Sequence, residues 1–224
     1  MLRDTLCRGS MMWRRWMMLL GLWLCSGCVR EVALTHEEQA LAQAAKVPLA
    51  IAALARGEGT SIARWVGHTD TYAPRPAEGI VVTTAPRQGR AVMERLRTRL
   101  RGSGYQAYLR DQHFGYGPDQ VVVVTRADDA AYLAVVRPDA VNYDMDHEAV
   151  MVRYRAWDAR YGLVLVGAGE DWLEVELRSP PPDWDAFARE VYAFCPDTVD
   201  QGVESVEALA AQMRQSRSVF LWWD

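Results

Sequence analysis

Hydrophobic residues follow two spacings along this chain, one typical of strands and one typical of helices. Short runs of apolar, often β-branched residues predict strands at 80–84, 105–110, 121–125, 163–166, 171–178 and 219–223. Apolar residues that recur every three or four positions predict helices between these strands. Because helices and strands are interspersed, with short hairpins among them, the pattern predicts an α+β fold in which helices pack on a mainly antiparallel β-sheet.

Capping and helix-breaking residues mark the ends of the predicted helices. Either Asp144 or Asp146 caps a helix that ends at Gly162, whose missing side chain permits the left-handed exit. Asp183 caps the next helix, which Pro196 terminates. These signals divide the C-terminal half of the chain into elements of ordinary length.

A helix that begins at Pro86 carries arginines on the side opposite its apolar stripe. The arginines on that side are Arg90, Arg97 and Arg101, and Arg95 and Arg99 lie on its flank. A face of this kind is typical of a helix surface in contact with water, and a patch for a membrane or an anionic ligand is the alternative.

The region before residue 79 predicts helices but no strand. Residues 35–38 fit a capping box at the start of one helix, and Pro48 begins a second, alanine-rich helix that ends near Gly57. The proline-containing segment 67–79 resembles a linker or an arm lying on the domain. We therefore predict N-terminal helices and an arm at 28–78, followed by a single α+β domain at 79–224.

The first 27 residues have the pattern of an export signal. A positively charged start precedes an apolar run at 16–24, which is too short to cross a bilayer that needs about twenty helical residues. The sequence that follows, Leu24-Cys25-Ser26-Gly27-Cys28, resembles the lipobox of bacterial lipoproteins. This resemblance predicts cleavage at 1–27 and lipid attachment at Cys28; secretion without lipid, or an uncleaved anchor, is the alternative.

Such a lipoprotein would be bound to the membrane of the cell envelope. Val29 follows Cys28, and without an aspartate at that position a Gram-negative host would place the protein on the periplasmic face of the outer membrane. Removing residues 1–27 leaves 21 basic and 28 acidic residues, a net charge of −7. A domain this acidic is a poor candidate for binding nucleic acid, because such binding depends on clustered Lys and Arg.

The C-terminal residues carry a resemblance to a known family. The matching stretches are Phe194-Cys195-Pro196-Asp197, Val199-Asp200-Gln201-Gly202 and Trp222-Trp223-Asp224, with Asn142-Tyr143-Asp144, 157–162, 167–172 and, more loosely, 113–119 and 72–74 upstream. The chain after about Val47 thereby resembles domain-of-unknown-function family 4253, most strongly in 113–224. That family has no assigned activity, so the resemblance implies a type of domain and no mechanism.

Two groups of residues could carry chemistry. Cys195 would be a nucleophile only if His113 or His147 activated it, and a cysteine at the end of an apolar helical stripe is more typical of a buried core residue. Acidic residues at 139–148 could hold a cation, but they lack EF-hand spacing and are favoured anyway at a helix start. The sequence therefore predicts no metal and no cofactor.

The C-terminal signature supplies the candidates for a binding site. They are Asp197, Asp200, Gln201, Trp222, Trp223 and Asp224. Residues 197–201 lie between two predicted helices, where they could cap a helix or line a pocket with the aromatic pair. Adjacent residues on a strand point to opposite faces, so we expect one tryptophan to be buried and the other to lie at the surface.

These observations favour a binding protein over an enzyme. We expect an envelope protein that binds another protein or cell-wall material and performs no chemistry of its own. The alternatives are a hydrolase or transferase that uses Cys195 or the acidic corner at 197–200, or an inhibitor or immunity-type protein. Thiol reactivity in the folded state would separate the enzyme from the binding protein.

Overall fold

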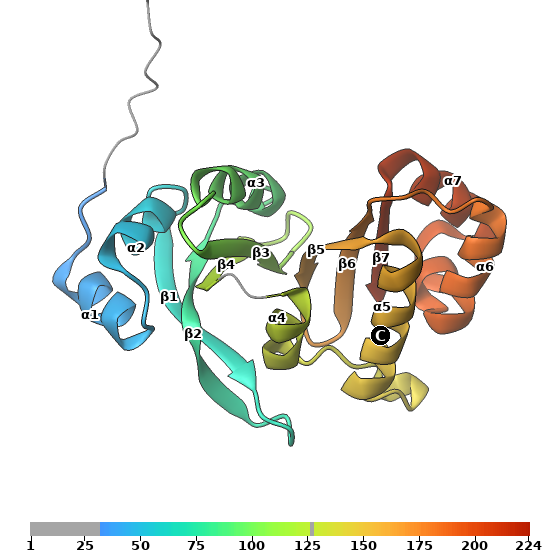
Figure 1. Cartoon of the computed structure of the whole chain (residues 1–224), viewed down its shortest axis with the longest axis horizontal. Helices are drawn as coiled ribbons and strands as arrows, with labels where there is room; N and C mark the ends of the chain where they lie inside the picture. Colours follow the sequence, from blue (N-terminus) through green and yellow to red (C-terminus); the bar gives the residue numbers. More distant parts are fainter. Residues whose placement is uncertain (1–31, 126–127) are drawn as a thin grey trace, which may run out of the picture. The chain divides into compact units, whose positions relative to one another are not determined.

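A single mixed β-sheet organises the protein (Figure 1), in a computed structural model that describes residues 32–125 and 128–224. The strands lie in the order β1-β2-β4-β3-β5-β6-β7, and every neighbouring pair is antiparallel except β3 and β5. The strands are β1 (Ser61–His68), β2 (Pro74–Thr83), β3 (Tyr105–Asp111), β4 (Gln120–Thr125), β5 (Leu163–Ala168), β6 (Trp172–Leu177) and β7 (Ser218–Trp222). The α+β prediction with a mainly antiparallel sheet is confirmed.

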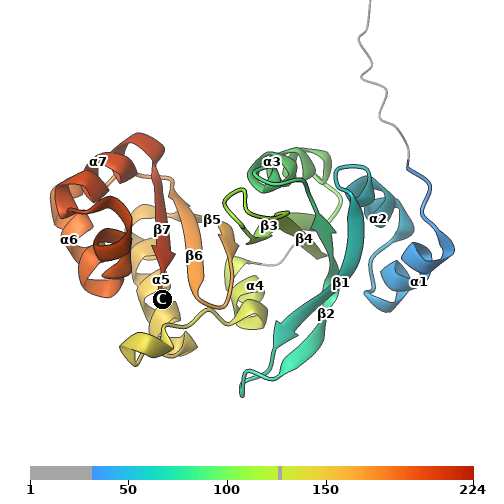
Figure 2. The ribbon, with the colours of Figure 1, turned by 180° about the vertical axis from the view of Figure 1, so that it is seen from behind.

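Helices cover both faces of this sheet and define two hydrophobic cores. The helices are α1 (His36–Ala44), α2 (Leu49–Arg56), α3 (Gly89–Arg99), α4 (Asp129–Val136), α5 (His147–Tyr161), α6 (Trp184–Phe194) and α7 (Val206–Ser216), with the short turns η1 (Val141–Tyr143) and η2 (Thr198–Val203). Residues of α1, α2 and α3 pack on one face, and residues of α4 to α7 pack on the other. Figure 2 shows the same arrangement from behind.

The joint between β3 and β5 connects the two halves of the sheet. Leu109 pairs with Gly167 there, and a Cβ atom at residue 167 would overlap the carbonyl oxygen of Leu109. Beside the joint, Arg97 of α3 donates to the carbonyl oxygen of Ala107 in β3 at 2.8 Å and to that of Leu165 in β5 at 2.6 Å. A glycine thus permits the close approach, and a guanidinium group satisfies backbone oxygens that the parallel pairing leaves open.

The predicted caps are confirmed, and one alternative is decided. Asp146, and not Asp144, caps α5, where its carboxylate accepts from the amide of Ala149 at 2.9 Å. Gly162 ends that helix with a positive φ of 64°. Asp183 caps α6 through two amides. These local signals worked because each cap depends only on residues within one turn of the helix end.

The interpretation of residues 67–79 as a linker or arm was wrong, as was the expectation that no strand precedes residue 79. Residues 61–83 form the β1-β2 hairpin, whose strands pair from Ser61 with Thr83 to His68 with Pro74. The two prolines of β2 hid this strand, because proline lacks the amide hydrogen that most strand positions use. The hairpin tolerates these prolines because they lie in the part of β2 that pairs with β1 only. Just residues 80–83 of β2 also pair with β4.

The arginines of α3 are held by other parts of the protein. Arg95 and Arg99 pair with Glu58 at 2.7 and 2.6 Å, and Arg90 pairs with Glu174 and Glu176 of β6. Glu174 is buried, so α3 partly covers the face of β6 that carries Glu174 and Glu176. The arginine side of α3 therefore joins elements of the fold, and neither a plain hydrated face nor an anionic-ligand patch describes it.

The predicted signal at 1–27 and the predicted lipid attachment at Cys28 lie outside the described residues. Within 32–125 and 128–224, no helix has both the length and the apolar character needed to span a bilayer.

Candidate functional site

The C-terminal signature forms a closed corner, which we define as residues 195–201 together with 222–224. Asp197 is buried at its centre, and its carboxylate accepts from the hydroxyl of Tyr143 at 2.6 Å, the side-chain amide of Gln201 at 3.0 Å and the backbone amide of Asp224 at 2.9 Å. Burial opposes the charged form, but these hydrogen bonds outweigh it and lower the pKa of Asp197. The corner thus ties η1, η2 and the C-terminus together.

Cys195 contributes to the same corner through the backbone of β7. Its thiol donates a hydrogen bond to the carbonyl oxygen of Trp222 at 3.0 Å, and its sulfur accepts one from the amide of Trp222 at 3.3 Å. Burial raises the pKa of the Cys195 thiol to about 12. A nucleophile needs the opposite shift, toward the thiolate. These contacts favour a structural role for Cys195.

The two adjacent tryptophans lie on opposite sides of the corner, as their positions on a strand predict. Trp223 is buried against Phe194, with the ring centroids 5.6 Å apart in an edge-to-face arrangement. Trp222 is half-buried and faces a large cleft. Asp200 and Gln201 are exposed, and the carboxylate of Asp200 accepts from Tyr192 at 3.1 Å. The structure therefore brings the predicted residues together, but only Trp222 lines the cleft.

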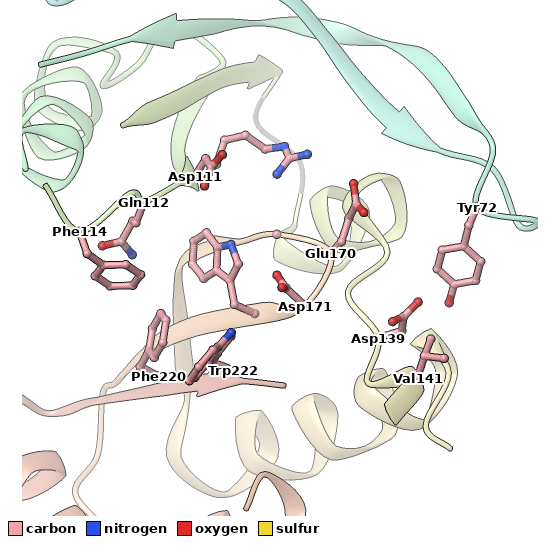
Figure 3. Close-up of a pocket in the computed structure, with 13 residues that line it drawn as sticks. Tyr72, Asp111, Gln112, Phe114, Asp139, Val141, Glu170, Asp171, Phe220 and Trp222 are labelled. Carbon is pink, nitrogen blue, oxygen red and sulfur yellow. The ribbon is translucent and has the colours of Figure 1, made fainter. Parts of the chain in front are cut away.

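The cleft has a volume of about 720 Å³ and lies where β3, the β5-β6 turn, β7 and η1 meet (Figure 3). One wall is aromatic and consists of Phe114, Trp172, Phe220 and Trp222. The polar groups around it are Asp111, Asp139, Glu170, Asp171 and Arg110. We call this the aromatic–acidic cleft. Pockets of this size that combine aromatic rings with a few polar groups are typical of binding sites.

Three rings of the aromatic wall contact one another. Trp172 stacks on Phe220 with the ring centroids 5.9 Å apart, and Phe114 and Phe220 form an edge-to-face pair with centroids 6.2 Å apart. Phe114 belongs to the loop 112–119 and is 62 % exposed, while its neighbour Tyr116 is 97 % exposed. Exposed aromatic side chains beside a cleft are characteristic of contact surfaces in protein interfaces.

The opposite wall carries an excess of negative charge. Four carboxylates and one guanidinium group line the cleft, and Glu170 and Asp171 are exposed side by side in the β5-β6 turn. Although the residue as a whole is exposed, the surrounding protein removes part of the water from the carboxylate of Asp171 and so raises its pKa, and the nearby negative charges of Glu170, Asp111 and Asp224 raise it further. Asp139 and Tyr72 stand at the far end of this wall (Figure 3).

Backbone contacts position both walls. The carbonyl oxygen of Glu170 accepts from the amide of Asp139 at 2.8 Å, and that of Asp171 accepts from Trp223 at 2.9 Å. Thus the β5-β6 turn is held between η1 and the C-terminal corner. On the aromatic side, buried Asp119 closes the loop 112–119 by accepting from the amides of His113 at 3.1 Å and Gly89 at 2.9 Å.

Most residues of the cleft were not recognised in the sequence. The acidic residues at 139–148 do not gather into one site: Asp139 lines the cleft, Asp146 caps α5, and Nδ1 of His147 lies 3.2 Å from the carbonyl oxygen of Pro138. Among the described residues, no group of three or more metal-ligating side chains is close enough to hold an ion. The aromatic and glycine-rich turns at 113–117 and 167–172 were the signals that could have identified the cleft.

Comparison with known proteins agrees with the resemblance in the C-terminal half. No curated protein and no solved structure matches the chain. Residues 120–224 match the family model described as Domain of unknown function (DUF4253). The match contains the whole corner and most of the cleft, but Phe114 and the β3 residues of the cleft lie before it. The chain therefore carries a DUF4253 domain at residues 120–224.

Proposed function

We propose that this protein is a lipid-anchored binding protein of the cell envelope, and that its aromatic–acidic cleft receives a partner without catalysing a reaction. The observation that carries the proposal is the cleft itself, in which a wall of aromatic rings faces a wall of carboxylates over about 720 Å³. Aromatic anchors surrounded by polar groups supply most of the energy in protein interfaces.

The residues that could perform chemistry support binding over catalysis. Cys195 is buried, with its pKa raised to about 12, and its thiol contacts the backbone of Trp222. Asp197 holds three hydrogen bonds within the corner, so its carboxylate is committed to the fold. We therefore assign the corner to architecture and the cleft to recognition.

The lipid anchor is proposed from the sequence pattern that ends at Cys28. Cleavage before Cys28 would leave residues 29–31 between the lipidated cysteine and the described domain. Cys28→Ser should leave the precursor uncleaved and free of radioactive palmitate in cells that process lipoproteins. Continued acyl labelling of that variant would contradict the anchor.

Site-specific photo-crosslinking in the native host tests the binding function. A benzoylphenylalanine residue at position 114 would place the crosslinker on the aromatic wall, and one at Val152 is the matched control, since Val152 is 64 % exposed on α5 and outside the cleft. We expect a discrete crosslinked product at position 114 that disappears when Trp222→Ala is added. Products that are the same at both positions, or a product at neither, would refute the proposal.

A further inference from the structure

We infer that the partner presents a Lys or Arg side chain next to an apolar or aromatic side chain, and that the cleft binds this pair from a segment of a partner protein. The inference rests on the function proposed above and names the chemistry of the bound segment. It follows from three features: the charge of the cleft, the position of its rings and the exposed loop beside it.

The charge of the cleft calls for a cationic group. Four carboxylates and the guanidinium group of Arg110 line it, and Asp224 adds negative charge near Asp171. Nε2 of His68 lies 3.2 Å from Glu170 and Nε2 of His113 lies 3.7 Å from Asp111, and these contacts offset negative charge only when the imidazoles are protonated. Like charges in a partly enclosed space repel each other more strongly than in water, because the local dielectric constant is lower. A Lys or Arg side chain placed between Glu170 and Asp171 would remove this repulsion on binding.

The rings call for an apolar neighbour of that cation. Figure 3 shows Phe114, Phe220 and Trp222 at one end of the cleft and Tyr72 and Asp139 at the other. Where the aromatic end adjoins the carboxylates, a ring face could also contact a guanidinium group of the partner through a cation–π interaction. A ligand with charge alone would use the acidic end and leave the aromatic end empty.

The exposed loop beside the cleft favours a protein segment over a small molecule. A volume of about 720 Å³ lies within the roughly 300–1,000 Å³ usual for ligand pockets, so the volume fits either occupant. Beyond the cleft, Tyr116 is almost fully exposed on the same loop as Phe114. A partner protein would cover this ring as well, whereas a small cation held in the cleft would not reach it.

Calorimetric titration of the full-length chain in detergent with two peptides tests the inference. The first probe is an acetylated, amidated hexapeptide of alternating arginine and tryptophan, and its control carries citrulline, an uncharged isostere, in place of arginine. We expect the arginine peptide to bind at least tenfold more tightly, with a difference that shrinks as salt is raised, since salt screens exposed charges. Glu170→Gln with Asp171→Asn should abolish the difference, and Glu94→Gln, an exposed carboxylate on α3 outside the cleft, should preserve it.

The outcomes separate this inference from the proposed function. Equal binding of both peptides, with both lost in Trp222→Ala, would overturn the requirement for a cation and leave the cleft as a binding site. Spermidine carries charge without apolar groups, so spermidine binding as tight as the arginine peptide and insensitive to Trp222→Ala would overturn the requirement for an apolar neighbour. A crosslinked product at position 114 without binding of either peptide would refute the inference alone. Absence of both would refute the proposed function too.

Discussion

The C-terminal corner and the aromatic–acidic cleft use the same residue types for opposite purposes. In the corner, Asp197 accepts three hydrogen bonds and Trp223 is buried against Phe194. In the cleft, Asp171 is exposed beside other carboxylates and Trp222 is half-buried at the wall. The two tryptophans are adjacent in the chain, so the difference comes from the side of β7 on which each ring lies. A motif can therefore contain one half that is buried in the fold and another half that lines a cleft.

The two regions also differ in how much of the chain they need. The corner lies entirely within residues 120–224, whereas the cleft also takes β3 residues and the loop 112–119 from outside that segment. Even β4, the first strand of the matched segment, pairs with β2 on one side and β3 on the other. The DUF4253 segment is thus one part of a larger folded unit, whose described residues are 32–125 and 128–224.

The largest expected effect comes from truncation to residues 79–224, a fragment that the sequence alone suggested would fold. The fragment retains every corner residue but loses α1, α2, β1 and the buried ring of Trp65. We now expect no cooperative thermal unfolding transition, because one face of β2 and the edge of the sheet would be exposed. Calorimetry against the chain from residue 32 is the measurement. A sharp transition would mean that the corner and its core suffice for folding.

Replacing the inner ring should separate the two regions most clearly. Trp223→Ala is expected to lower the free energy of unfolding by about 3–5 kcal/mol, since it leaves a cavity beside Phe194. Trp222→Ala, the matched control, should cost about 1 kcal/mol and instead remove partner crosslinking. Urea denaturation of both variants provides the comparison. Equal losses of stability would mean that the outer ring is also architectural.

The next effect concerns the carboxylate at the centre of the corner. Asp197→Asn should cost about 1–3 kcal/mol at neutral pH, because buried donors lose a charged acceptor. The pKa of Asp197 is lowered in the folded state, so its contribution is present above the unfolded pKa and is lost as pH falls through the folded value. The stability difference between wild type and variant should therefore shrink on acidification. Urea denaturation of both proteins at neutral and at acidic pH is the measurement, and a difference that grows on acidification would contradict the prediction.

The smallest expected effect concerns the thiol of Cys195, which we expect not to be alkylated in the folded protein. With its pKa raised to about 12, Cys195 would be a thiolate in on the order of one molecule in ten thousand at pH 8, and the side chain is buried. Iodoacetamide should leave the peptide that contains Cys195 unmodified in the folded protein and label it fully in denaturant, as read by mass spectrometry. Rapid labelling in the native state would instead support the alternative hypothesis of an enzyme that uses Cys195.

Prediction from the sequence succeeded where the cause is local. The cap at Asp183, the helix end at Gly162 and the opposite placement of Trp222 and Trp223 depend only on residues within one turn or one strand. It failed at β1 and β2, where prolines obscured a hairpin that is stabilised by pairing with β4. The residues of the candidate cleft were found in part, because the signature includes Trp222 but gave no indication of its neighbours from β3 and the β5-β6 turn.

The sequence by itself determined the class of fold, the order of most elements, the helix caps and the burial of one of two neighbouring tryptophans. Those properties follow from periodicity and from hydrogen bonds between residues close in the chain. Only the tertiary structure decided that Arg97 bridges β3 and β5, that Asp197 serves the corner and that Asp171 faces a cleft. A carboxylate or guanidinium group has the same local pattern in each setting. Its role depends on which distant strands and turns the sheet brings beside it. Because the order of the strands in the sheet differs from their order in the chain, the spacing of residues in the sequence does not predict those neighbours.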